Sequence, residues 1–228
     1  MEKLNVIYED NHIIVVEKKP NIPSQQDKTG DMDMLTLVKE YIKEKYHKPG
    51  EVYLGLVHRL DRPVGGVMVF ARTSKAAARL SEQVRNKVFK KTYLTIVDGK
   101  LEPSNGTLED YLVKNEKNNL SKVTKPETKN AKLAKLDYET IKYDKDLNLS
   151  VLKIRLHTGR HHQIRVQFSS RDHSIYGDQK YGTRGRGKQI CLWAYSLTIV
   201  HPITKEEMSF TCLPEKIGSW KILENIPI

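Results

Sequence analysis

The sequence has no long hydrophobic run and only 2 cysteines among its 228 residues. Its longest apolar stretches, IIVV at 13–16 and VMVFA at 67–71, are strand-sized and far below the roughly 18 residues that a membrane-spanning helix requires. The N-terminal MEKLNVIYEDNH has no apolar core of the kind found in secretory signals. Cys191 and Cys212 show no metal-ligand spacing and suit buried positions in a reducing compartment. We therefore expect a cytoplasmic protein that does not engage a membrane.

Acidic residues are too few to balance the basic ones: 28 Asp and Glu face 39 Lys and Arg, which gives a formal net charge of +11. Lysine and arginine that neutralise phosphates release the counterions condensed on a polyanion, and this release drives association. The excess of positive charge therefore indicates a nucleic-acid partner. A soluble basic protein without such a partner is the alternative, and charge alone does not separate the two.

Helical spacing of apolar residues predicts two helices in the first half of the chain. The first is expected over 31–46, and the second over 74–88 with Ser74 as its N-cap. Two further helices are expected to begin near Arg160 and near Pro214, the latter short.

Strand-like stretches fill most of the remaining sequence. Residues 114–132 differ from them, because they are polar and rich in lysine, and we expect them to form a connection. No repeat or linker is visible, and the strands are too clustered for an alternating parallel sheet, so a single mixed domain is expected over 1–228. The expected strands lie at 5–19 (two strands around an Asp10-Asn11 turn), 67–73, 91–99, 134–157 (two strands), 190–200 and 206–213.

Residues 182–189, GTRGRGKQ, match the first seven positions of the phosphate-loop pattern G-x-x-x-x-G-K-[ST]. Gln189 stands where the pattern requires a hydroxyl for magnesium, and the segment leads into a predicted strand instead of a helix. We therefore expect a basic loop in which Arg184, Arg186 and Lys188 are available to phosphates. An ordinary solvated loop is the open alternative.

Histidines lie close together in LHTGRHHQIR, residues 156–165. His157 and His161 would share one face of a helix, but Thr158 and Gly159 between them predict a break. The His-Glu-x-x-His pattern of zinc proteases is also missing. We therefore expect no metal site, and interpret the segment as a polar turn in front of a helix.

The stretch VHRLDRPVGG, residues 57–66, places Asp61 between Arg59 and Arg62. In an extended chain Arg59 and Asp61 would point to one side, and Leu60 would point into the core. Neighbouring guanidinium groups would keep the carboxylate ionised, which is the form that a nucleophile requires. The two glycines would permit a tight turn or the close approach of a ligand. A structural ion pair at a turn is the competing interpretation.

The chain resembles the RluA-like RNA pseudouridine synthases in three ordered segments, GLVHRLDRPVGGVMVFARTSKAA, KKTYLTIVDG and LKIRLHTGRHHQIRVQFSSRDHSIYGDQKYG. The resemblance extends from VIYEDNHIIVVEKKP to YSLTIVHPITKEEMSF, nearly the whole chain. It implies an α+β fold with a long, mixed, mostly antiparallel sheet, flanking helices and a central catalytic cleft. It also implies isomerisation of specific uridines in ribosomal or transfer RNA to pseudouridine, without a cofactor or metal.

By this resemblance Asp61 is the catalytic aspartate, Tyr93 packs on the target base, and Arg165 pairs with the aspartate. An anionic aspartate can attack the base or assist its departure from the sugar, and a tyrosine offers a flat face with a hydroxyl at its tip. The target uridine must be flipped out or lie in a loop. We expect a monomer that acts on RNA. The residues assigned to substrate binding are Arg59, Arg62, Arg160, His162, Gln163, Arg184, Arg186, Lys188 and, as an apolar side chain lining the base pocket, Leu192.

The chain departs from the family pattern in ways that leave the target uridine open. Many relatives carry a small RNA-binding domain before the catalytic one, whereas this sequence starts with the catalytic motifs. PVGG at 63–66 replaces a usual Asp-Thr-Ser-Gly, and His161 replaces a common threonine. A non-catalytic RNA-binding protein on the same scaffold is the alternative function, and a binder would not need Asp61, Tyr93 and Arg165 together. A phosphate-loop nucleotidase is disfavoured by the missing hydroxyl described above.

Overall fold

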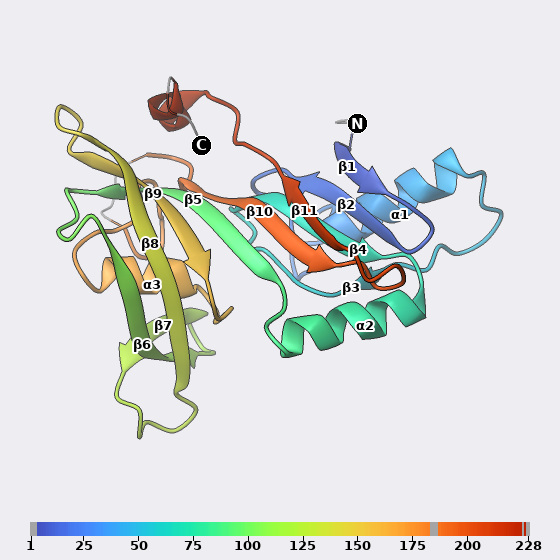
Figure 1. Ribbon diagram of the computed structural model, residues 1–228, viewed down its shortest axis with the longest axis horizontal. Helices are drawn as coiled ribbons and strands as arrows, with labels where there is room; N and C mark the ends of the chain where they lie inside the picture. The colour runs from blue at the N-terminus through green and yellow to red at the C-terminus, as the bar shows by residue number, and fades with distance from the viewer. Residues whose placement is uncertain (1–3, 183–186, 225, 227–228) are drawn as a thin grey trace. The chain divides into compact units, whose positions relative to one another are not determined.

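The computed structural model describes residues 4–182, 187–224 and 226. The chain divides into two compact units, Met1–Lys90 with Ala194–Leu213, and Lys91–Trp193 with Pro214–Ile228. Figure 1 labels the α-helices and strands of both units. Within the described ranges, no helix is long and apolar enough to cross a membrane.

The first unit combines helices with short strands. The bounds of its elements are β1 (Val6–Glu9), β2 (Ile13–Lys18), α1 (Met34–Lys45), β3 (Gly55–Leu56), β4 (Gly65–Ala71), α2 (Ser74–Arg85), β10 (Leu192–Val200) and β11 (Glu207–Thr211). Neighbouring strands follow the order β1-β2-β4-β10, with β3 beside β4 and β11 beside β10. The pairs β1–β2, β2–β4, β3–β4 and β10–β11 are antiparallel.

Alternating apolar residues build the core of this unit. Ile13 and Val15 of β2 pack with Val67 and Val69 of β4 and with Leu80 of α2, all of them buried. Because side chains alternate along a strand, these positions share one face, which α2 covers with its apolar stripe. The sequence pattern predicted these elements for this physical reason.

The predicted N-cap of α2 is wrong by one residue. The cap is Thr73, whose side chain accepts a hydrogen bond from the backbone N–H of Ala76 at 3.2 Å, and Ser74 is the first helical residue. Threonine and serine are both good N-caps, so the sequence alone does not show which of these two adjacent residues caps the helix.

The second unit is built on a ladder of five strands. Its elements are β5 (Lys90–Asp98), β6 (Asn105–Asn115), β7 (Leu120–Thr124), β8 (Lys132–Asp144), β9 (Leu149–Leu156), α3 (Gln163–Ser169) and the 3-10 helix η1 (Gly218–Leu223). The strands follow the order β5-β9-β8-β6-β7, and each neighbouring pair is antiparallel. The predicted α+β class with mostly antiparallel pairing is confirmed.

Helix α3 packs on this ladder, beside β6 and β8 (Figure 1). Val166 lies buried against Leu112 and Ala134. The side chain of Gln167 has no exposed surface, and its Nε2 donates a hydrogen bond to Asp110 at 2.8 Å. The helix is therefore held by apolar packing and by hydrogen bonds, and it provides a fixed platform for the residues it carries.

The expected polar connection over 114–132 is wrong. The segment contains the end of β6, the whole of β7 and the start of β8, with Lys114 opposite Ser121 in the β6–β7 ladder. The turn between the two strands places Asn119 at a positive φ of 52°. Lysine-rich strands without an apolar face show little alternation of apolar and polar residues. The sequence therefore does not reveal them, and their pairing depends on the neighbouring strands.

Candidate active site

The segment between β3 and β4 that carries Asp61 is held by its own turn and by Ser24. The hydroxyl of Ser24 donates to the carbonyl of Leu60 at 2.8 Å and accepts from its N–H at 3.1 Å. The N–H of Val64 donates to the carbonyl of Asp61 at 2.9 Å. Leu60 is 8% exposed, as predicted, while Asp61 is partly exposed. A fixed backbone therefore presents the carboxylate.

Lys18, the last residue of β2, is fully buried beside this turn. Its Nζ donates to the carbonyl oxygens of Val64 at 2.6 Å, Arg62 at 2.8 Å and Lys19 at 3.2 Å. Burial lowers the pKa of Lys18 to about 7, and the negative charge of Asp61 opposes that shift. The sequence analysis missed this cation, because IIVVEKKP predicted only the end of a strand.

The two arginines beside Asp61 have different surroundings. Arg62 donates to Asp31 and, at 3.5 Å, to Asp27, so its guanidinium is bound to the loop that carries these two carboxylates. The expectation that Arg62 pairs directly with Asp61 is therefore not met. Arg59 is exposed and makes no hydrogen bond or ion pair within the described part of the chain, which leaves it available to a substrate.

Gly66 of β4 permits a close approach between strands. Its φ is +126°, and an added β-carbon would lie 2.2 Å from the carbonyl oxygen of Ala194 in β10. Only a residue without a side chain fits there. We expected a tight turn or room for a ligand at this glycine. The space beside it is instead filled by the backbone of Ala194.

Tyr93 lies on β5 in the second unit, opposite Ile154 of β9. Lys91 precedes it by two residues, so both side chains leave the same face of the strand. Burial lowers the pKa of Lys91. Its Nζ lies 3.9 Å from the position that a β-carbon on Gly159 would take. The ammonium group of Lys91 therefore lies beside the turn that precedes α3.

Arg165 of α3 is held by Asp178. Its Nε donates to Oδ2 at 2.7 Å and its Nη2 to Oδ1 at 2.6 Å, between side chains that are 4% and 0% exposed. The backbone N–H groups of Lys180 and Tyr181 donate to the same carboxylate at 2.8 Å and 3.1 Å. A bidentate pair fixes the plane of the guanidinium. The sequence analysis named the arginine but missed this aspartate.

Tyr181 connects Arg165 to β7. The guanidinium carbon lies 5.2 Å from the centre of the tyrosine ring, within the range of a cation–π contact. The tyrosine Oη accepts from the N–H of Ser121 at 2.7 Å and lies 2.7 Å from Nδ1 of His162. Burial first, and then the charge of Arg165, lowers the pKa of His162 to about 2, so the ring is neutral. A neutral imidazole carries its proton on one of two nitrogens, so the tautomer of His162 sets whether Nδ1 accepts from the tyrosine hydroxyl or donates to it.

Gln163 organises the turn before α3. Its Oε1 accepts from the hydroxyl of Thr158 at 2.7 Å and from the N–H of Arg160 at 3.0 Å, and its Nε2 donates to the carbonyl of Lys135 at 3.2 Å. It is 3% exposed. Because its amide is engaged inside the protein, the structure gives Gln163 an internal role and argues against the expected substrate contact. Arg160 is partly exposed and donates from Nε to the carbonyl of Leu133 at 2.8 Å.

The clustered histidines of the sequence turn to separate partners. Nε2 of His157 lies 2.6 Å from Asp137, and Nδ1 of His161 lies 2.9 Å from the hydroxyl of Ser121. The rings of His161 and His162 stack with their centres 3.7 Å apart. Among the described residues, no group of three or more His, Cys, Asp or Glu is placed to hold a metal ion.

The remaining candidates lie near the start of β10. Leu192 is 5% exposed and Lys188 is exposed. Arg184 and Arg186 lie outside the described residues.

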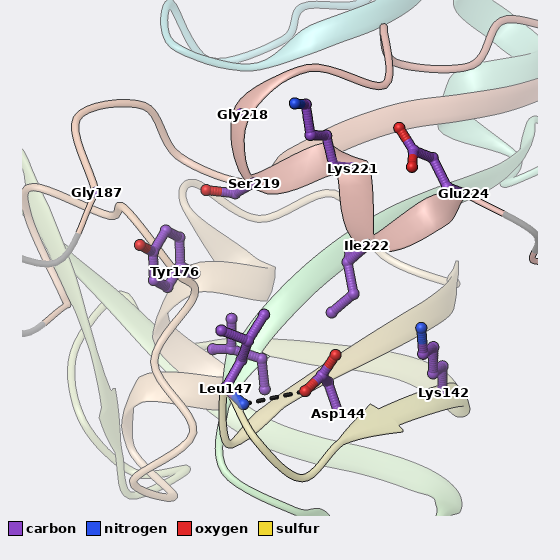
Figure 2. Close-up of a pocket in the computed structure, with 11 residues that line it drawn as sticks. Lys142, Asp144, Leu147, Tyr176, Gly187, Gly218, Ser219, Lys221, Ile222 and Glu224 are labelled. Carbon is purple, nitrogen blue, oxygen red and sulfur yellow. Dashed lines mark hydrogen bonds between the residues drawn. The ribbon is translucent and has the colours of Figure 1, made fainter.

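A hollow of about 780 Å³ lies beside η1 in the second unit. Figure 2 shows Tyr176, Leu147 and Ile222 around it. Its charged side chains are two lysines and two carboxylates, namely Lys142, Lys221, Asp144 and Glu224. This balanced lining gives no preference for an anionic ligand, and we assign the hollow no part in the chemistry.

Comparison with known proteins decides the family. A profile described as RNA pseudouridylate synthase matches residues 12–170. The chain belongs to this family. It is 32% identical over 213 residues to the dual-specificity RNA pseudouridine synthase RluA of Escherichia coli O157:H7, covering 91% of each chain. It is 31% identical over 208 residues to the uncharacterized RNA pseudouridine synthase YhcT of Bacillus subtilis (strain 168), covering 90% of this chain and 66% of that protein.

A solved structure shares the fold of this synthase family member. Human RNA Pseudouridylate Synthase Domain Containing 4 matches with a TM-score of 0.77 at 23% identity, covering 92% of this chain and 89% of the human one. The resemblance stated from the sequence motifs is thus confirmed. Membership places the chain among isomerases that modify RNA.

Proposed function

We propose that this synthase converts uridine to pseudouridine with Asp61 as the nucleophile, Arg165 as its ionic partner and Tyr93 as the ring against the target base. One observation supports the assignment: the backbone turn that carries Asp61 is bound by the buried Lys18, and the guanidinium of Arg165 is held in a buried pair with Asp178. Catalysis requires reacting groups that are oriented before the substrate arrives.

The proposed reaction needs no atom from outside the substrate. The bond between ribose and a ring nitrogen of uracil breaks, a bond from the same ribose carbon to a ring carbon forms, and the hydrogen of that ring carbon is lost while the nitrogen gains one. An ionised Asp61 can attack the base or assist its departure, and Arg165 stabilises the anion. Asp178 accepts from Nε and Nη2 of Arg165 and thereby fixes the plane of its guanidinium.

The proposed substrate is a uridine in a loop of ribosomal or transfer RNA, or one flipped out of a helix. Arg59, Arg160 and Lys188 provide phosphate contacts, because each has an exposed or partly exposed cationic side chain. We further propose that residues 1–228 act as one catalytic domain, as a monomer in the cytoplasm. The E. coli relative is named a dual-specificity RNA pseudouridine synthase, which supports RNA as the substrate. The same proposal assigns substrate binding to five further residues: Arg62, His162, Leu192, Arg184 and Arg186.

The test measures pseudouridine and RNA binding separately. RNA from cells with and without the protein is first mapped for pseudouridine, and a transcript containing the target is used in single-turnover assays. Asp61→Asn keeps the size and removes the charge, so conversion should fall to background while RNA affinity changes less than about twofold. Asp146→Asn, an exposed aspartate in the β8–β9 turn, is the matched control and should behave as wild type.

Two results would count against the proposal. Wild-type conversion by Asp61→Asn would return that residue to a structural ion pair at a turn. Tight RNA binding without a target uridine in the mapped RNA would favour the non-catalytic binder.

A further inference from the structure

Residues 114–132, here called the lysine hairpin, carry unneutralised positive charge. They hold six lysines against two glutamates. Some exposed lysines elsewhere have carboxylate partners, such as Lys90 with Glu207 and Lys100 with Glu102. Five lysines of the hairpin are exposed and form no ion pair within the described part of the chain: Lys117, Lys122, Lys125, Lys129 and Lys132.

The lysine hairpin is joined to the segment that holds Arg165. The N–H of Ser121 donates to Oη of Tyr181 at 2.7 Å, and the ring of Tyr181 lies against Arg165. At the tip of the hairpin, Nζ of Lys180 donates to the carbonyl of Asn119 at 3.2 Å. All of these residues belong to the second unit, where β7 lies beside α3 (Figure 1).

Positive charge continues from the lysine hairpin toward the turn before α3. The pKa of His162 is lowered most by burial and then by the charges of Arg165, His161, Lys180 and Lys114. Lys114 lies opposite Ser121 in the ladder, so its side chain leaves the face that contacts the histidines. The cationic surface and the arginine therefore lie on neighbouring parts of one unit.

We propose that the lysine hairpin binds the RNA backbone beside the nucleotide that enters the active site. The inference rests on the proposed function, because it takes the polyanion to be the RNA substrate. Lysines distributed over strands and turns suit a run of phosphates, since each ammonium acts as a point charge and releases counterions. Stable binding to a membrane surface needs a buried apolar face in addition to charge, and the hairpin offers one exposed large apolar residue, Val123 at 37%.

The test compares two variants that each have four fewer positive charges than wild type. The hairpin variant carries Lys→Gln at 117, 122, 125 and 129. The control carries Lys→Gln at 43, 48, 75 and 87, which are exposed, without ion pairs in the described ranges, and in the first unit. Affinity for an unmodified tRNA transcript is measured between about 50 and 200 mM salt.

We expect the hairpin variant to bind about tenfold or more weakly, with a salt slope reduced by roughly 0.7 to 0.9 for each phosphate that the protein no longer neutralises. The control should stay within about twofold of wild type in affinity and slope. The single-turnover rate at saturating RNA should be unchanged in both variants, because the bonds to phosphate position the substrate and do not take part in the chemistry.

Equal weakening of the two variants would overturn the inference, because net charge alone would then explain RNA binding. Unchanged RNA affinity in the hairpin variant, or a selective loss of binding to phosphatidylserine vesicles, would also overturn it. Affinity is measured without reference to isomerisation. A wild type that binds RNA but makes no pseudouridine would therefore refute the proposed function while leaving this comparison decisive.

Discussion

Asp178 and Arg165 form a two-bond pair, 2.7 Å and 2.6 Å long, in which neither side chain exposes more than 4% of its surface. Removing two charges from water is unfavourable unless the remaining hydrogen-bonding positions are satisfied. Two backbone N–H groups also donate to this carboxylate, at 2.8 Å and 3.1 Å. The guanidinium is therefore oriented by the fold itself, and under the proposed function Asp178 is a positioning residue that acts through Arg165.

Asp178→Asn should lower the saturated single-turnover rate by roughly 10- to 100-fold while RNA affinity changes little, because the arginine loses its fixed orientation. Breaking a buried pair should also lower the free energy of unfolding by about 3 to 5 kcal/mol, so rates are compared at a temperature where the variant is folded. Glu109→Gln, which breaks the exposed pair with Lys135, is the control and should leave both quantities nearly unchanged. A folded Asp178→Asn protein with a normal saturated rate would leave Asp178 a purely structural residue.

Lys18 should make stability rise with pH across a defined range. Its pKa is about 7 in the folded protein against an ordinary 10.5, so between these values the unfolded chain binds more protons than the folded one. The free energy of unfolding therefore gains a positive slope over that range, by up to about 1.4 kcal/mol per pH unit. Lys18→Met should flatten this slope and also lower stability by about 1 to 3 kcal/mol, because carbonyls of the Asp61 turn lose their donor.

Urea unfolding of both proteins at several pH values between 7 and 10 measures this effect. Other titrating groups are common to the two proteins, so the difference between the slopes belongs to Lys18. If the free energy of unfolding had the same pH dependence in the wild type and in Lys18→Met, Lys18 would be protonated over this whole pH range in the folded state.

Tyr93 should act mainly through the face of its ring. Tyr93→Phe keeps the face and is expected to retain the saturated rate within about tenfold, whereas Tyr93→Ala should lower it more than about 100-fold. Tyr143→Phe, on β8 of the same unit, removes a hydroxyl bound to Asn148 and serves as the control. An equal decrease in the two Tyr93 variants would instead assign proton transfer to the hydroxyl.

The sequence predicted what depends on neighbours along the chain. Asp10 closes the turn between β1 and β2 by accepting from the N–H groups of His12 and Ile13 at 2.7 Å and 2.8 Å. Such side-chain-to-backbone bonds are local, and Asx turns of this kind are visible in sequence. The apolar stripe of α1 is equally local, and Met34, Val38 and Ile42 are buried in the structure.

The supporting residues of the site depend on partners far away in sequence, and the sequence did not reveal them. Asp178 is 13 residues from Arg165, and Lys18 is 44 residues from Arg62. Gln163 was expected to bind substrate. Its hydrogen bonds to Thr158 and Lys135 form only in the folded chain, so the sequence does not show them. Burial is what turns these polar groups inward, and burial follows from tertiary packing.

The unpaired lysines of the hairpin also affect the protein when RNA is absent. Like charges on neighbouring strands and turns repel one another, and this repulsion opposes the compact state. Small anions from the solvent must then gather around the hairpin and reduce that repulsion. Added salt should therefore have two opposite effects: it raises the free energy of unfolding of the free enzyme, and it lowers the affinity of the enzyme for RNA.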